Sequence, residues 1–119
     1  MKIIITFFLI FTTQLFLGQE SRIQQIKNNI EEISTSEPGI TEKININIKE
    51  ASLSSFLLAI AEVHKLNISV APNLAQINIV NNFTDVTVAD LLVFLCKEYD
   101  LKIDFTGNII AIKKFIQPI

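Results

Sequence analysis

An internal repeat constrains the fold of this chain more than any other feature of its sequence. A shift of 35 positions, which carries Ala51 onto Val86, aligns apolar residues with apolar residues through two copies. The other aligned pairs are Ile48 with Phe83, Leu53 with Val88, Phe56 with Leu91, Leu57 with Leu92, Ile60 with Leu95, Ala61 with Cys96, Leu66 with Leu101, Ile68 with Ile103 and Val70 with Phe105. Each copy is therefore expected to form a strand, a tight turn, a helix and a second strand.

The first copy begins with an alternating segment, in which isoleucines at 44, 46 and 48 are separated by Asn45 and Asn47. This period of two predicts a strand with one buried face. Ser52 is expected to cap the following helix, and a strand over 67–70 should end at Ala71-Pro72-Asn73. The apolar stripe of the helix is Leu53, Phe56, Leu57, Ile60, Ala61 and His64.

The second copy repeats this order and adds a hairpin. A strand is expected over 76–83, and Thr87 with Asp90 resembles a capping box at the start of the helix. Residues 101–105 alternate again, and a turn over 106–108 leads into a strand over 109–112. The apolar stripe of this helix is Val88, Leu91, Leu92, Leu95, Cys96 and Tyr99. Two helices and five strands in this order give an α+β fold made of two β-α-β repeats and a C-terminal β-hairpin.

The amino-terminal segment has the layout of an export signal. Lys2 supplies a positive charge, and residues 3–17 are apolar apart from three threonines and one glutamine. This run is shorter than the roughly 20 apolar residues of a membrane-spanning helix. We therefore expect a signal peptide over 1–18, cleaved near Gly18-Gln19, rather than a retained anchor.

Three further segments are expected around the repeat. In residues 19–34 isoleucines at 23, 26, 30 and 33 form one stripe of an amphipathic helix, which would dock on its own domain or act as a short pairing helix. Docking is favoured, because barely two heptads seldom form a coiled coil. Turn formers and a proline mark a linker over 35–42, and the domain is expected to cover 43–114. Residues 115–119 read as the beginning of a linker or tail. We therefore favour a fragment of a longer protein over a free-standing adaptor.

Composition argues against several classes of function. The 119 residues carry a formal net charge of -2, with 18% charged residues, so no basic field for nucleic acid exists. The chain has one cysteine, one histidine and three glycines, which leaves no internal disulfide, no repeated histidine ligand and no glycine-rich phosphate loop. We expect no cofactor, no metal site and no small-molecule substrate.

The reactive side chains also have structural explanations. Cys96 aligns with Ala61 in the repeat, so a buried and inert thiol is expected. His64 falls at a helix end, where the helix dipole favours a positive charge. Asp85 fits a turn and Asp90 a helix cap. No nucleophile and base are paired, so we expect no catalytic residues and no enzyme.

Four stretches of the sequence together resemble the secretin and TonB short N-terminal domain. They are ININIKEASLSSFL (44–57), NISVAPNL (67–74), NFTDVTVADLL (82–92) and TGNIIAI (106–112). The resemblance covers about residues 43–114 and rests on apolar and turn patterns. It implies two helices packed between a two-stranded and a three-stranded sheet.

The resemblance also implies a role and a location. Such domains lie in the bacterial periplasm at the front of an outer-membrane secretin used in protein secretion, where they help to build a ring and dock inner-membrane machinery or cargo. The segment 70–74 is more similar to this branch. The alternative is the signalling domain of a TonB-dependent receptor, which contacts a periplasmic regulator. Either way the expected partner is a protein, with a homo-oligomeric ring in the secretin case.

Polar strand positions are the candidate partner-binding residues. Asparagine can hydrogen-bond to a partner without the desolvation cost of a full charge, and open strand edges accept another chain. Asparagines that only solubilise the outer faces are the equally weighted alternative. The candidates, chosen for predicted outward positions on the strands, are Asn45, Asn47, Asn78 and Asn81.

Overall fold

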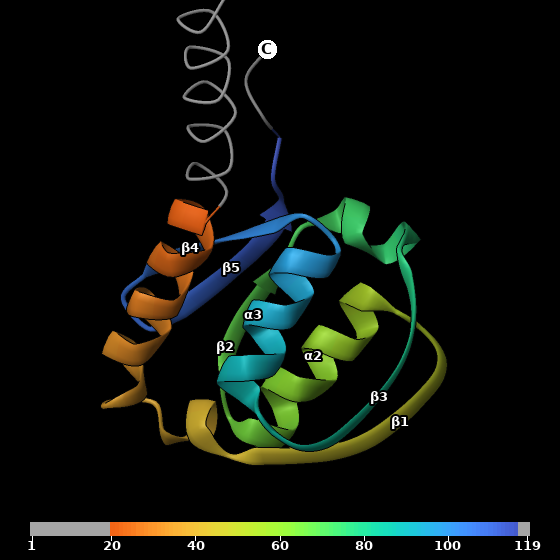
Figure 1. Cartoon of the computed structure of the whole chain (residues 1–119), viewed down its shortest axis with the longest axis horizontal. Helices are drawn as coiled ribbons and strands as arrows, with labels where there is room; N and C mark the ends of the chain where they lie inside the picture. The colour runs from red at the N-terminus through yellow and green to blue at the C-terminus, as the bar shows by residue number, and fades with distance from the viewer. Residues whose placement is uncertain (1–19, 117–119) are drawn as a thin grey trace, which may run out of the picture.

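The computed structural model describes residues 20–116 (Figure 1). The expected signal peptide over 1–18 lies outside these residues. Within the described part of the chain, no helix is long and apolar enough to cross a membrane.

The fold is α+β, as expected, with two central helices between two small sheets (Figure 1). One sheet has two strands in the order β1-β3, and the other has three in the order β2-β5-β4. A further helix covers residues 20–34. The elements are η1 (Pro38–Thr41), β1 (Lys43–Ser52), α2 (Leu53–His64), β2 (Asn67–Val70), η2 (Pro72–Gln76), β3 (Asn78–Thr87), α3 (Val88–Glu98), β4 (Leu101–Thr106) and β5 (Ile109–Lys114).

The two copies of the repeat are the units β1-α2-β2 and β3-α3-β4. Their first strands, β1 and β3, pair with each other and run antiparallel. Their second strands do not touch but both pair with β5, β2 in parallel and β4 antiparallel. The predicted hairpin strand is therefore what joins the two copies in the second sheet.

Both central helices begin where a strand ends, and local caps fix these points. The Ser52 Oγ accepts a hydrogen bond from the backbone N–H of Ser55 at 3.1 Å. The Thr87 Oγ1 accepts one from the N–H of Asp90, also at 3.1 Å. Each cap satisfies one of the amide groups that a helix leaves unpaired in its first turn. The two predicted N-caps are confirmed.

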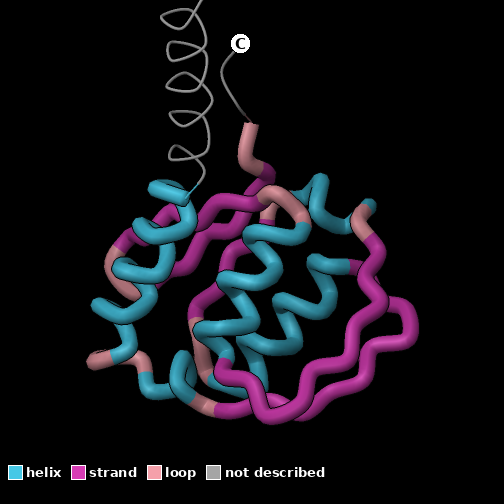
Figure 2. Tube along the Cα trace, viewed as in Figure 1, coloured by secondary structure: helices cyan, strands magenta, loops and turns pink. Residues whose placement is uncertain are grey.

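The pairing of β1 with β3 is irregular, and this corrects the predicted alternation of isoleucines. Ile44 and Ile48 are buried, but Ile46 is 38% exposed. The register shifts between Ile44 and Ile46, and Asp85 on the opposite strand has a φ of 57°, in the left-handed region. Such a bulge bends a strand and redirects its side chains. Figure 2 shows the resulting ribbon curving around the helices.

The helix over residues 20–34 docks on the domain, which is the arrangement that we favoured from its stripe of isoleucines. Ile23, Ile26 and Ile30 are buried in the same core cluster as the inner residues of α2 and α3. The Arg22 side chain donates to the carbonyl oxygen of Leu101 at the start of β4. The helix therefore extends the layer of helices that covers the three-stranded sheet.

The segment over 35–42, expected to be a linker, contributes to the core instead. Ile40 is fully buried, and η1 packs beside the end of α2. A side chain on Gly39 would collide with the carbonyl oxygen of His64, so this approach requires glycine. The turn formers thus create a compact corner rather than a spacer.

Candidate protein-docking surfaces

The four candidate asparagines do not form one surface. Asn47 and Asn78 are exposed, and they lie opposite Asn82 and Ser52, at different points of the β1–β3 ladder. A second register shift, between Ile48 and Ala51, separates these two points of the ladder, and the spacing of residues in the sequence does not reveal it.

Two of these asparagines have structural contacts. The Asn45 Oδ1 accepts a hydrogen bond from the N–H of Asp85 at 2.8 Å, which supports the bulge. Asn81 is half-buried between Ile79 and Phe83, and the Tyr99 hydroxyl donates to its Oδ1 at 3.5 Å. The predicted outward position of Asn81 is therefore wrong, because its side chain lies on the helix-facing side of β3.

The reactive side chains are occupied or inaccessible. Cys96 is 1% exposed, and burial raises the pKa of its thiol to about 12. A thiol held neutral in this way is a poor nucleophile. The His64 Nδ1 lies 3.1 Å from the Glu42 Oε1, which ties the end of α2 to the corner after η1. Among residues 20–116, no group of three acidic, histidine or cysteine side chains could hold a metal ion.

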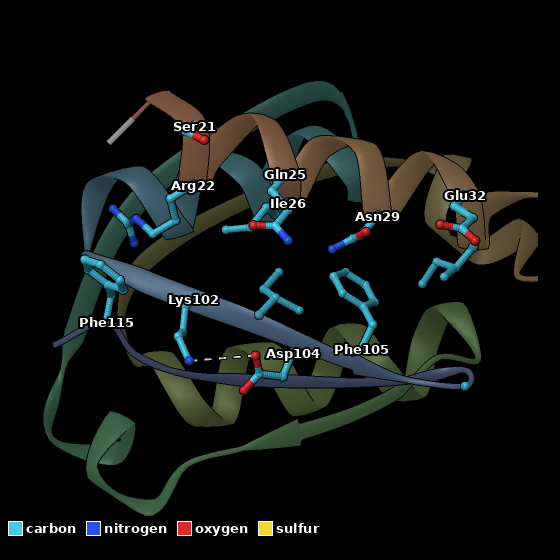
Figure 3. A pocket seen from close by; sticks show the side chains of 13 residues that line it. Ser21, Arg22, Gln25, Ile26, Asn29, Glu32, Lys102, Asp104, Phe105 and Phe115 are labelled. Carbon is cyan, nitrogen blue, oxygen red and sulfur yellow. Dashed lines mark ion pairs between the residues drawn. The ribbon is translucent and has the colours of Figure 1, made fainter. Parts of the chain in front are cut away.

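A groove between the helix over 20–34 and strand β4 was not foreseen from the sequence (Figure 3). Its volume is about 780 Å³, and its lining comes from the helix, β4, the turn between β4 and β5, and the residue that follows β5. Gln25, Asn29 and Phe105 face this space from opposite walls (Figure 3). No sequence signal could have placed the groove, because it depends on where the helix docks.

Arg22 closes one end of the groove. Its guanidinium donates to the carbonyl oxygen of Leu101 and, at 3.0 Å, to the Asp100 Oδ1. The guanidinium carbon also lies 4.1 Å from the centre of the Phe115 ring, a cation–π distance. The Arg22 side chain is 14% exposed, whereas its ion-pair partner Asp100 is 62% exposed, so the ion pair lies at the surface.

The charges around the groove are balanced. Its lining includes two basic side chains, Arg22 and Lys102, and two acidic side chains, Glu32 and Asp104. The Asp104 carboxylate lies 2.7 Å from the Lys113 Nζ and 3.8 Å from the Lys102 Nζ. The hydrogen bond from Lys113 is the main reason that the pKa of Asp104 lies below its usual value.

A second surface, the Phe83 patch, consists of Ile46, Phe83 and Phe94. The rings of Phe83 and Phe94 meet edge to face with centres 5.7 Å apart, and Ile46 lies opposite Phe83 in the ladder. Ile46 and Phe94 are each 38% exposed. The bulge in the ribbon is what leaves Ile46 at the surface.

Comparison with known proteins adds no assignment. No protein-family model matches the chain, and no curated protein matches it.

Proposed function

We propose that this chain is an exported protein-docking module of the secretin and TonB short N-terminal type, which acts in the periplasm at the front of an outer-membrane secretin. The observation that supports the proposal is the packing of α2 and α3 between a two-stranded antiparallel sheet and a mixed three-stranded sheet. This layout is the one that the sequence resemblance implies. The open strand edges offer the backbone groups by which such a module binds another chain.

The alternative is the signalling domain of a TonB-dependent receptor. The same fold serves both roles, so the fold alone does not favour one of them. They differ in stoichiometry: a secretin module meets further copies of itself in a ring, whereas a receptor module meets one regulator. The resemblance of residues 70–74 to the secretin branch favours the ring.

Photo-crosslinking in the native cells tests the proposal. A benzophenone amino acid is placed at one exposed position on each edge strand: Asn47 on β1, Asn67 on β2, Asn82 on β3 and Thr106 on β4. For a ring, irradiation should give products that increase by the mass of one subunit, recovered with the cell envelope. Unirradiated cells are the control.

Other results have defined meanings. A single product with a periplasmic regulator domain, identified by mass spectrometry, would support the receptor alternative. Recovery of the protein from the cytoplasm, or no product at any of the four edges, would contradict docking in the periplasm.

A further inference from the structure

One edge of strand β4 carries backbone groups that point away from its sheet. The N–H of Phe115 donates to the carbonyl oxygen of Asp100 at 2.9 Å, so these two residues form a hydrogen-bonded pair at the end of the β4–β5 ladder. This pair determines which residues of β4 form hydrogen bonds with β5. Because antiparallel partners alternate, Lys102, Asp104 and Thr106 bond to β5. The backbone groups of Leu101, Ile103 and Phe105 then face the opposite edge.

An independent contact agrees with this assignment of the outward-facing backbone groups. The Leu101 carbonyl accepts a hydrogen bond from Arg22, which lies on the side away from β5. Beyond Leu101, the N–H and C=O groups of Ile103 and Phe105 have no hydrogen-bond partner on that side among residues 20–116. Both residues line the groove. The groove therefore contains donors and acceptors at the spacing of an edge strand, which another strand can satisfy.

The opposite wall indicates the chemistry of the occupant. Gln25 and Asn29 project their neutral amide groups from the helix toward β4 (Figure 3). The charged groups of the lining are balanced, and Arg22, Lys102 and Asp104 already have ion-pair partners. A charged segment would lose hydration without gaining an unpaired opposite charge, except at exposed Glu32. The surroundings thus favour an uncharged segment.

We infer that an extended, uncharged segment of a partner protein adds to the β4 edge as a fourth strand, in the groove beneath the helix over residues 20–34. This inference rests on the proposed docking function and identifies the site through which it acts. Backbone hydrogen bonds to Ile103 and Phe105 supply the affinity, and contacts with Gln25 and Asn29 select the side chains.

A second copy of the chain fits this edge less well. Symmetric pairing of two β4 strands would place both helices over 20–34 on the same side of the joined sheet, because the two-fold axis is perpendicular to it. The two helices would then compete for the space above the paired strands. The partner is therefore expected to be a free segment rather than a second folded domain.

A tethered strand tests the inference. A segment of alternating valine and threonine, as long as the 6 residues of β4, is appended after Ile119 of the full-length chain. A glycine–serine linker of about ten residues spans roughly 17–19 Å and holds the segment at about millimolar effective concentration. Hydrogen exchange at the amides of Ile103 and Phe105 is then measured by NMR, in a mild detergent that keeps the apolar amino-terminal segment in solution.

The expected result is exchange at these two amides about tenfold slower than in the untailed chain, on the order of the protection given by a local strand pairing. A tail of alternating valine and glutamate should give no protection. Asn29→Tyr, which fills the groove, should abolish the effect of the valine–threonine tail. Asn28→Tyr is the matched control on the outer side of the same helix and should preserve it.

Three results would overturn the inference: no slowing with the valine–threonine tail, equal slowing in Asn29→Tyr, or protection that maps to β1 or β3. Concentration-dependent protection without any tail would show that a second copy occupies the edge, which also overturns it. If any of these results were obtained, crosslinks at the other strand edges in the native cells would still support the docking function. Protection by the tail without any crosslink in cells would contradict the docking function alone.

Discussion

At the scale of single residues, Arg22 joins the amino-terminal helix to the three-stranded sheet. Its guanidinium contacts the carbonyl of the first residue of β4, the carboxylate of the residue before it and the aromatic ring of the residue that follows β5. A planar group with several fixed donors suits this task better than the single ammonium of lysine. The buried Nε has no partner among the described residues, which offsets part of the gain.

Replacing this side chain tests its contribution. Arg22→Ala is expected to lower the free energy of unfolding by about 2 kcal/mol, since it removes a charged hydrogen bond to a carbonyl and a cation–π contact. The ion pair with Asp100 adds little, because that carboxylate is 62% exposed. Urea unfolding measures the change. Arg22→Lys should lie between the two proteins, and a loss below about 0.5 kcal/mol in Arg22→Ala would contradict this role.

Cys96 gives a prediction about pH. Burial raises the pKa of its thiol from 9.0 to about 12, so the folded state favours the neutral thiol. The contribution of the neutral thiol to the free energy of unfolding is complete below pH 9 and is lost as the pH rises toward 12. Between these values the free energy of unfolding should fall by up to roughly 1.4 kcal/mol per pH unit more than in Cys96→Ala.

The control for this measurement comes from the repeat. Alanine occupies the equivalent position in the first copy, at Ala61, so Cys96→Ala is expected to keep the fold. Urea titrations of both proteins between pH 8 and pH 11 compare the slopes. Parallel curves would show that the thiol ionises equally well in both states.

At the scale of elements, the β1–β3 ribbon depends on its bulge. Asp85 adopts a left-handed backbone conformation, and the Asn45 side chain accepts the hydrogen bond of its amide group. The bulge bends the ribbon and leaves Ile46 at the surface, opposite the buried Phe83 in the ladder. A local hydrogen bond thus decides which apolar side chains reach the surface.

Asn45 and Asn47, two candidate partner-binding residues on β1, are expected to differ in their contribution to stability. Asn45→Ala is expected to lower the free energy of unfolding by about 1 kcal/mol, because it removes the acceptor for Asp85. Asn47→Ala removes an exposed side chain and should change stability by less than about 0.5 kcal/mol. Thermal and urea unfolding of both variants provide the comparison. Equal losses would show that the contact with Asp85 does not stabilise the ribbon.

At the scale of the whole molecule, one core connects both sheets, both central helices and the amino-terminal helix. Ile26, Ile30 and Ile40 belong to the same buried cluster as the strands of the domain. Side chains that share a core tend to unfold together in a domain of this size. The segment before β1 is therefore expected to unfold with the domain.

Native-state hydrogen exchange tests this cooperativity. Amides at 26–30 should exchange with the same free energy and urea dependence as the central amides of α3. Ile116, which is 81% exposed, provides a rapidly exchanging reference near the end of the described chain. Opening of the amino-terminal helix at several kcal/mol less would show that it is a separate unit and would remove one wall of the groove.

The sequence predicted the elements well, and among the four candidate asparagines it misplaced only Asn81. Ser52 and Thr87 cap their helices through residues three positions away, so a local pattern was sufficient. Asn81 was misplaced because its orientation depends on β3 packing against the helices. The groove beside β4 could not be anticipated, since it is formed by segments from opposite ends of the chain.

The sequence by itself determined the α+β class, the two repeated units, their caps and the final hairpin, because periodicity and turn chemistry act over a few residues. Only the tertiary structure decided that Ile46 is exposed, that Ile40 is buried and that the amino-terminal helix lies beside β4. The physical reason is the separation of the groups involved. Arg22 and Asp100 are 78 positions apart, and no local preference brings them together before the core forms.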